Sequence, residues 1–125
     1  MPHFRLEHSS NILEDLNSKE FFSDIHILLN ELGPFDIKTM KSRIIPCDKY
    51  FVSDGTKDQA FIHLELSMLP GRPADLKKKI SLRLLEELKK TFNETFQQKI
   101  CSFSVEIREL EGDSYSKEIS EGKSL

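Results

Sequence analysis

The chain has 125 residues, of which 18 are Lys or Arg and 21 are Asp or Glu, and its formal net charge is -3. This length fits one domain with a modest core, and the slightly acidic balance argues against nucleic acid as the main partner. No apolar run reaches the roughly 18 residues of a membrane span, and the N-terminus lacks a signal-peptide layout. We therefore expect a cytoplasmic protein with Cys47 and Cys101 reduced, no membrane contact and no metal site, because the four histidines lack metal-ligand spacing.

The first half of the chain has the periodicity of strand, helix and strand. The predicted segments are a half-buried strand over 2–8, a helix over 12–32 with a break near 17–18, and a strand over 37–45. Gly33-Pro34 ends the helix, and Pro46 limits the pairing of the second strand.

The second half repeats that order. Alternating residues predict a strand over 60–67 and another over 101–108, and apolar residues recur every four positions between 76 and 96. Pro73 suits the first turn of this second helix. After Gly112 the chain is polar, which is typical of a mobile tail or of an arm that reaches a neighbouring subunit.

The two halves also resemble each other in sequence. Residues 4–9 (FRLEHS) align with residues 62–67 (IHLELS), and the same alignment places Pro2 opposite Ala60. Two βαβ units predict an α+β fold, with a four-stranded mixed sheet and two helices packed on one face. We assign residues 1–125 to a single domain, divided into a first unit (2–57), a second unit (58–111) and a polar C-terminal tail (112–125).

Pro2 is the first candidate functional residue. A small second residue lets the initiator methionine be removed, which leaves a secondary amine at the start of the first predicted strand. Burial or nearby cations lower the pKa of such an amine, so it can act as a general base near neutral pH. The plain alternative is that Pro2 reflects N-terminal processing only.

Five further stretches of sequence are distinctive, and they are Met1-Pro2-His3-Phe4, Lys41-Ser42-Arg43, Asp54-Gly55 through 60–63, Gly71-Arg72 and 104–110. Through these residues and the repeated βαβ order, the chain resembles the tautomerase superfamily, and within it the 5-carboxymethyl-2-hydroxymuconate isomerase family. The resemblance implies a cofactor-free 1,3-proton transfer that turns a carboxylated dienol into an unsaturated ketone, in bacterial homoprotocatechuate breakdown. It also implies a tautomerase-like homotrimer with its sites near subunit boundaries.

The resemblance and the residue chemistry together select six site residues. Pro2 and Arg72 are the expected catalytic residues, because a guanidinium at a helix N-terminus can clamp a carboxylate or polarise a developing carbonyl. Arg43 and Lys41 share a strand face and are expected to bind substrate carboxylates. Phe61 and His63 are the remaining expected substrate-binding residues. For all of these except Pro2, the plain alternative is a surface charge or ordinary packing.

One residue departs from the pattern we expect of the family. Lys41 stands where we expect an arginine, and lysine lacks the planar fork that grips a carboxylate with two hydrogen bonds. Two alternatives stay open. The departure at Lys41 supports a tautomerase of another enol, such as phenylpyruvate. The other alternative is a non-catalytic trimeric binding protein on the same scaffold, in which Pro2 takes no part in chemistry.

Overall fold

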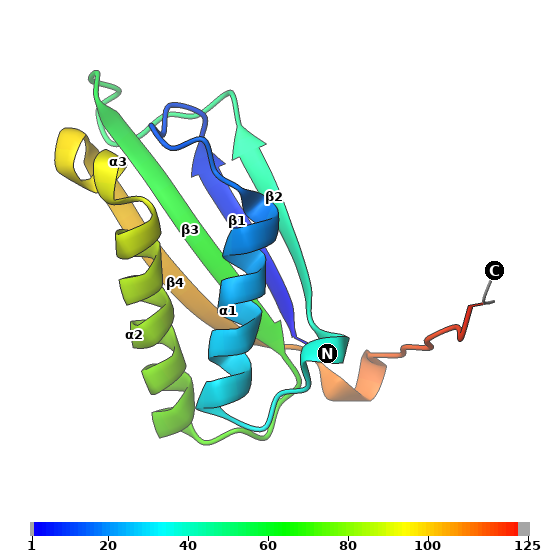
Figure 1. Cartoon of the computed structure of the whole chain (residues 1–125). Helices are drawn as coiled ribbons and strands as arrows, with labels where there is room; N and C mark the ends of the chain where they lie inside the picture. The colour runs from blue at the N-terminus through cyan, green and yellow to red at the C-terminus, as the bar shows by residue number, and fades with distance from the viewer. Residues whose placement is uncertain (1, 123–125) are drawn as a thin grey trace.

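Four strands form one mixed sheet in the computed structural model, which describes residues 2–122. The elements in chain order are β1 (His3–Ser9), α1 (Ser18–Leu32), η1 (Ile37–Thr39), β2 (Lys41–Cys47), β3 (Gln59–Met68), α2 (Ala74–Thr91), α3 (Asn93–Gln98), β4 (Ile100–Glu109) and η2 (Gly112–Ser114) (Figure 1). The labels η1 and η2 denote single turns of 3₁₀ helix.

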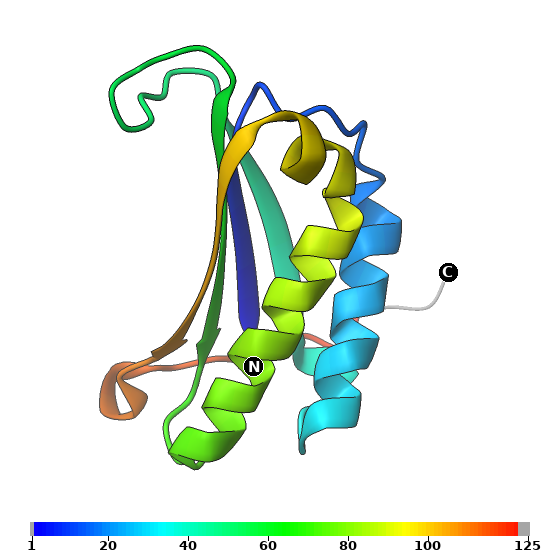
Figure 2. The same cartoon turned by 90° about the vertical axis from the view of Figure 1, so that its left-hand side faces the viewer.

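The sheet order β2-β1-β3-β4 joins two parallel pairs through one antiparallel contact. Each parallel pair and its helix is a βαβ unit, and both long helices cover the same face of the sheet (Figure 2). At the central contact Leu6 pairs with Leu64, the residue that the internal alignment makes its equivalent. An approximate two-fold axis therefore passes between β1 and β3. The predicted fold class, with its mixed sheet and two helices on one face, is confirmed.

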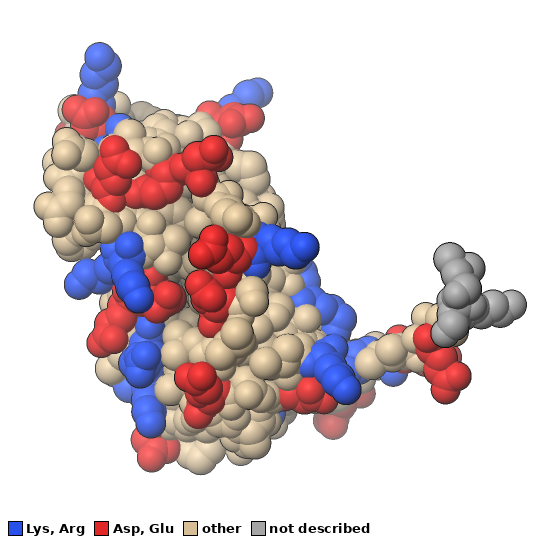
Figure 3. Space-filling model, in the orientation of Figure 1, with Lys and Arg blue, Asp and Glu red and all other residues tan. Residues whose placement is uncertain are grey.

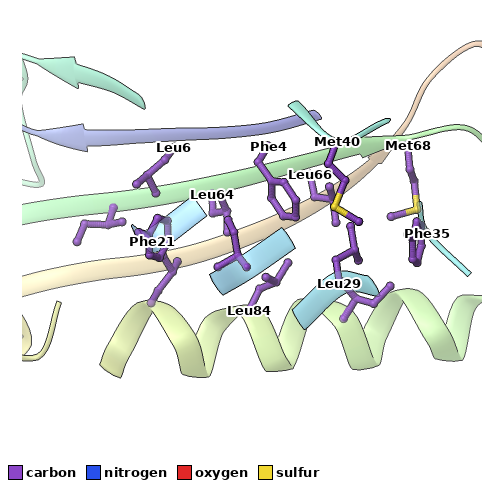
Figure 4. Close-up of a cluster of buried hydrophobic side chains, with 14 of the residues drawn as sticks. Phe4, Leu6, Phe21, Leu29, Phe35, Met40, Leu64, Leu66, Met68 and Leu84 are labelled. Atoms are coloured by element: carbon purple, nitrogen blue, oxygen red, sulfur yellow. The ribbon is translucent and has the colours of Figure 1, made fainter. Parts of the chain in front are cut away.

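Alternation along the two central strands builds the core. Phe4 and Leu6 of β1 are fully buried, as are Ile62, Leu64 and Leu66 of β3. Their partners from the helices are also fully buried and comprise Ile25, Leu29, Ile80, Leu84 and Leu88. Figure 4 shows several of these side chains meeting between the sheet and the helices. Burial of each large apolar side chain contributes roughly 1.5–3 kcal/mol, so this layer holds both units together.

The first helix is shorter than predicted. It begins at Ser18, because the side chain of Asn17 accepts a hydrogen bond of 3.1 Å from the backbone N–H of Glu20 and so caps the helix. The expected break is therefore the start of the helix. Ile12 and Leu16 are outside it but still pack against the core, which explains their helix-like periodicity.

Two boundaries of the strand predicted over 37–45 are also wrong. Asp36 accepts a hydrogen bond from the backbone N–H of Lys38 at 3.0 Å and caps η1, so β2 begins only at Lys41. The strand then continues through Pro46 to Cys47. β2 is an edge strand, and an edge position tolerates the missing N–H of proline.

The second helix is interrupted near its C-terminal end. α2 ends at Thr91, Phe92 has a non-helical backbone with ψ of 37°, and α3 then continues the apolar pattern. The side chain of Phe92 is fully buried, so packing accounts for the periodicity across the break. Pro73 is the N-cap residue of α2 and does not lie in its first turn. No described helix is long and apolar enough to cross a membrane.

Candidate active site

The topology gathers several of the predicted site residues at one end of the sheet. β1 and β2 are parallel and both start there, whereas β3 is antiparallel to β1 and ends there. Pro2 and Lys41 therefore lie at this end, together with the connector from Met68 to α2 that contains Arg72. Figure 4 shows Phe35, Met40 and Met68 lining the core at the same end, beyond Phe4.

Pro2 is buried directly before β1. Its carbonyl accepts a hydrogen bond of 3.0 Å from the backbone N–H of Lys41, and Phe4, two residues later, is fully buried. The backbone hydrogen bond to β2 and the burial of Phe4 in the core thus fix the position of Pro2. Removal of residue 1 would leave the amine at this fixed position.

Two cationic side chains of β2 act on His3, the residue that follows Pro2. The Arg43 guanidinium (Nη2) lies 2.8 Å from Nδ1 of His3, and Nζ of Lys41 donates to the carbonyl of Thr39 at 3.0 Å. Partial burial lowers the pKa of His3 below its ordinary value of 6.5, and the positive charges of Arg43 and Lys41 lower it further. The residue next to Pro2 thus experiences a positive electrostatic potential.

Arg72 lies at the N-terminal end of α2. Gly71, with φ of 120°, permits the turn before it, because a residue with a side chain would be strained there. The Arg72 guanidinium lies 4.6 Å from the centre of the Phe35 ring. It also contacts the carbonyls of Leu69 and Pro34, each at 3.5 Å. These contacts orient the group but are long, so its donors remain available for an anion.

Phe61 and His63 lie farther along the sheet in the same chain. The backbone N–H of Phe61 donates to Oγ of Ser9 at 3.0 Å, which places Phe61 at the end of β1 opposite to Pro2. At about 3.3 Å per strand residue, that separation is roughly 20 Å. His63 contacts Oγ of Ser104 at 2.6 Å through Nδ1. A single chain therefore does not bring these two residues to Pro2.

A cluster of His63, Glu65 and Glu106 has its potential ligand atoms within 4.8 Å of one another. Arg108 lies among them, at 3.6 Å from a carboxylate oxygen of Glu65 and 3.8 Å from one of Glu106. The arginine supplies the cation that these carboxylates face. The arrangement is explained as an ion-pair network on the sheet face that the helices leave open.

Pro2 lines neither of two hollows on the surface. One, of about 180 Å³, is at the start of α1 and is lined by Leu16, Asn17, Glu20, Phe21, Asp24 and Thr91. The other, of about 430 Å³, lies between α2 and β4 and is lined by residues such as Lys77 and Val105. Side chains of both charges spread over the helical face, which presents no continuous basic surface among the described residues (Figure 3).

Sequence reasoning missed two residues of this end of the molecule, Phe35 and Tyr115. Phe35 is 3% exposed and lies against the Arg72 guanidinium. Tyr115 comes from the segment expected to be mobile or to reach a neighbour, yet its hydroxyl lies 3.4 Å from Nε2 of His3 in the same chain. The available signal for Tyr115 was an aromatic residue within an otherwise polar tail.

Comparison with known proteins gives consistent matches over nearly the whole chain. The model of the 5-carboxymethyl-2-hydroxymuconate isomerase family matches residues 2–120. A 5-carboxymethyl-2-hydroxymuconate Delta-isomerase of Escherichia coli is 30% identical over 110 residues, which are 88% of this chain and 87% of the relative. The crystal structure of a 5-carboxymethyl-2-hydroxymuconate isomerase from Deinococcus radiodurans R1 has a TM-score of 0.85 at 26% identity, and the match covers 95% of this chain and 90% of the other. A fused symmetric trimer of wild-type 4-OT shares the fold, with a TM-score of 0.70 at 10% identity over 98% of this chain and 94% of that one.

Proposed function

The chain belongs to the 5-carboxymethyl-2-hydroxymuconate isomerase family and is an isomerase, and on this premise we propose its substrate and mechanism. The substrate is 5-carboxymethyl-2-hydroxymuconate, a dienol with several carboxylates, and the product is its unsaturated keto form. The general base is the amine of Pro2 after removal of residue 1. The observation that carries the proposal is the position of Pro2, which is buried directly before a central strand and adjoins His3, the residue whose pKa the cations of β2 lower.

In this mechanism the Pro2 amine takes the proton of the dienol hydroxyl. The O–H bond breaks, an N–H bond forms, and the conjugated electrons shift so that the C=O bond forms. The protonated amine then delivers a proton to a carbon of the conjugated chain, which regenerates the base. Protons and electrons balance without a cofactor. The same cations that lower the pKa of His3 would lower that of the adjacent amine and keep it unprotonated near neutral pH.

Arginines at this end of the sheet provide the complementary charge for an anionic substrate. Among the described residues Arg43 has no carboxylate partner, and the Arg72 guanidinium makes only long contacts to carbonyls. We assign Arg72 to the developing carbonyl or an adjacent carboxylate, and Arg43 and Lys41 to a second carboxylate. A charge-assisted bidentate contact is the strongest hydrogen-bonded recognition that a carboxylate receives from a side chain.

We further propose that the working form is a homotrimer in which a neighbouring copy supplies Phe61 and His63. Phe61 and His63 alternate along β3 with the buried residues Ala60, Ile62 and Leu64, so they belong to the opposite face of the sheet. Neither α1 nor α2 covers that face (Figure 2). That face also carries the charged network of Glu65, Glu106 and Arg108. Packing sheets against one another would bring the far end of one β3 toward the Pro2 end of another.

A second candidate is a tautomerase of a mono-carboxylated enol such as phenylpyruvate. The observation that favours it is the Lys41 ammonium, which donates to the carbonyl of Thr39 at 3.0 Å. A Lys41 held by that contact leaves Arg43 as the cation of β2 for a substrate carboxylate, so a second carboxylate on the substrate would gain little. Turnover of the two enols, measured side by side, discriminates between the candidates. A kcat/KM for phenylpyruvate enol equal to or above that for the dienol favours the second.

The test combines intact mass with activity. Mass spectrometry reports whether residue 1 has been removed, and the conversion of the dienol is followed by absorbance. Pro2→Ala retains a primary amine, so we expect most of the activity to be lost but a residual rate to persist. Pro46→Ala is the matched control, because Pro46 is exposed on β2 away from this end of the sheet. Full activity in a correctly processed Pro2→Ala protein would contradict the proposal.

A further inference from the structure

His3 lies between the guanidinium of Arg43 and the hydroxyl of Tyr115. Nδ1 of His3 is 2.8 Å from Nη2 of Arg43, and Nε2 is 3.4 Å from the Tyr115 oxygen. A guanidinium has only donors, so Nδ1 must be the acceptor and cannot carry a proton. The contacts with Arg43 and Tyr115 therefore indicate a neutral His3 ring with its proton on Nε2, where the proton faces the tyrosine hydroxyl.

A neutral acceptor orients an arginine without cancelling its charge. Arg43 is exposed and, within residues 2–122, forms no ion pair, whereas Arg5, two residues from His3 on β1, pairs with Glu7 at 3.0 Å. A carboxylate at position 3 would also hold the guanidinium but would compete with any bound anion. The histidine thus leaves the full positive charge of Arg43 available.

The charges around His3 favour this neutral state. Arg5 is on its own strand, Lys41 and Arg43 face it from β2, and Lys117 contributes from the C-terminal segment. On β3 the residue paired with His3 is Ser67. The nearby Glu65, two residues from Ser67 on the same strand, forms an ion pair with Arg108 at 3.6 Å. Burial, Arg43 and Lys41 accordingly hold the pKa of His3 below 6.5, so the ring stays neutral at neutral pH.

We propose that His3 is a positioning residue that holds Arg43 in place for a substrate carboxylate, and that protonation of His3 releases Arg43. This inference rests on the proposed role of Arg43 in substrate binding. A proton on Nδ1 replaces the acceptor with a donor and sets two cations against each other. Substrate affinity then decreases as the pH decreases, and the group that titrates takes no part in the proton transfer itself. Tyr115 accepts from Nε2 and stabilises the required tautomer.

The kinetic test compares two substitutions at His3. His3→Asn provides an acceptor oxygen near the position of Nδ1 but does not titrate, whereas His3→Leu removes the acceptor. At about pH 7.5 we expect His3→Leu to raise KM about tenfold with a much smaller change in kcat, and His3→Asn to stay within about threefold of the unmodified protein. Between about pH 7.5 and about pH 5.5 the KM of the unmodified protein should rise, and that of His3→Asn should not.

A double-mutant cycle with Arg43→Gln tests whether the effect acts through Arg43. If His3 works by positioning Arg43, His3→Leu should raise KM no further in the Arg43→Gln background. Equal and additive increases in KM in the two backgrounds would overturn the inference. So would a His3→Asn protein whose KM matches that of His3→Leu and keeps the pH dependence.

A spectroscopic test is independent of activity. Ring-nitrogen NMR shifts of His3, assigned by their loss in His3→Asn, should show the Nε2–H tautomer near neutral pH. Arg43→Gln should raise the pKa of His3, and Arg83→Gln, on the outer side of α2, should leave it unchanged. An Nδ1–H tautomer, or a pKa of His3 that Arg43→Gln does not move, overturns this inference. Full activity in Pro2→Ala would instead refute the proposed mechanism while leaving the His3 result intact.

Discussion

Replacing Arg72 with glutamine should separate catalysis from stability. The structure gives the guanidinium one cation–π contact, 4.6 Å from the centre of the Phe35 ring, and two contacts of 3.5 Å to carbonyls. The first is worth about 0.5–1 kcal/mol and the long contacts add little, so the free energy of unfolding should fall by about 1 kcal/mol or less. Removing a donor aimed at developing negative charge costs about 10²–10³ in rate. We therefore expect kcat to fall by about 10²-fold or more.

The assay is the steady-state conversion of the dienol, measured beside urea unfolding of the same preparations. Arg83→Gln is the matched control, because Arg83 is also on α2 and forms only an exposed pair with Glu86 at 3.6 Å. Its kcat should equal that of the unmodified protein. Arg72→Lys keeps the charge but loses the planar fork, so its kcat should fall between the two. A kcat within twofold of the unmodified protein in Arg72→Gln would refute the assignment.

Three further outcomes test groups whose environments the structure defines. Thr95→Val should lower the free energy of unfolding by about 1–3 kcal/mol in urea titration. The buried Thr95 donates to one carboxylate oxygen of Glu14 through its backbone N–H and to the other through its hydroxyl, and valine loses the hydroxyl bond. An unchanged urea midpoint of unfolding would contradict this. Burial holds the pKa of His26 below 6.5, so as the pH falls below 6.5 the unfolded chain takes up a proton before the folded one and stability is lost. In His26→Gln the decrease in the free energy of unfolding between about pH 7.5 and about pH 5.5 should therefore be smaller. An equal decrease would show that His26 does not contribute. Burial, and secondly the charge of Glu14, raises the pKa of Cys101 from 9.0 to about 11. In Cys47→Ser, where Cys101 is the remaining thiol, alkylation should be about 100-fold slower in the folded than in the urea-unfolded protein, because the thiolate is the reactive form. Equal alkylation rates would argue against the raised pKa.

Periodicity predicted the elements because it follows burial, and it misplaced their ends for the same reason. Ile12 and Leu16 pack on the core outside α1, and the buried Phe92 lies in the break between α2 and α3. Apolar spacing continues across these breaks although the backbone changes. The ends are set by capping side chains such as Asn17, whose effect is local and leaves the apolar pattern unchanged.

The candidate site was predictable where strand order and chain position decide it. Pro2 and Lys41 meet because β1 and β2 are parallel, and the connector that contains Arg72 follows from the end of β3. The contacts of Tyr115 with His3 could not be predicted, because they join residues far apart in sequence through a segment without periodicity. Phe61 lies at the end of β1 opposite to Pro2 in the same chain, so its proposed role depends on a neighbouring copy, which the pattern of one chain does not describe.

The central claim is that the Pro2 amine is the base, and a ¹⁵N NMR titration of that amine tests it most directly. The account predicts a chain that starts at Pro2 with an amine pKa below the ordinary α-amino range of about 7.7–8.0. It also predicts that kcat/KM rises with pH through the same pKa, because the base acts unprotonated. A pKa at or above the ordinary range, with kcat/KM already at its maximum well below it, would contradict the account.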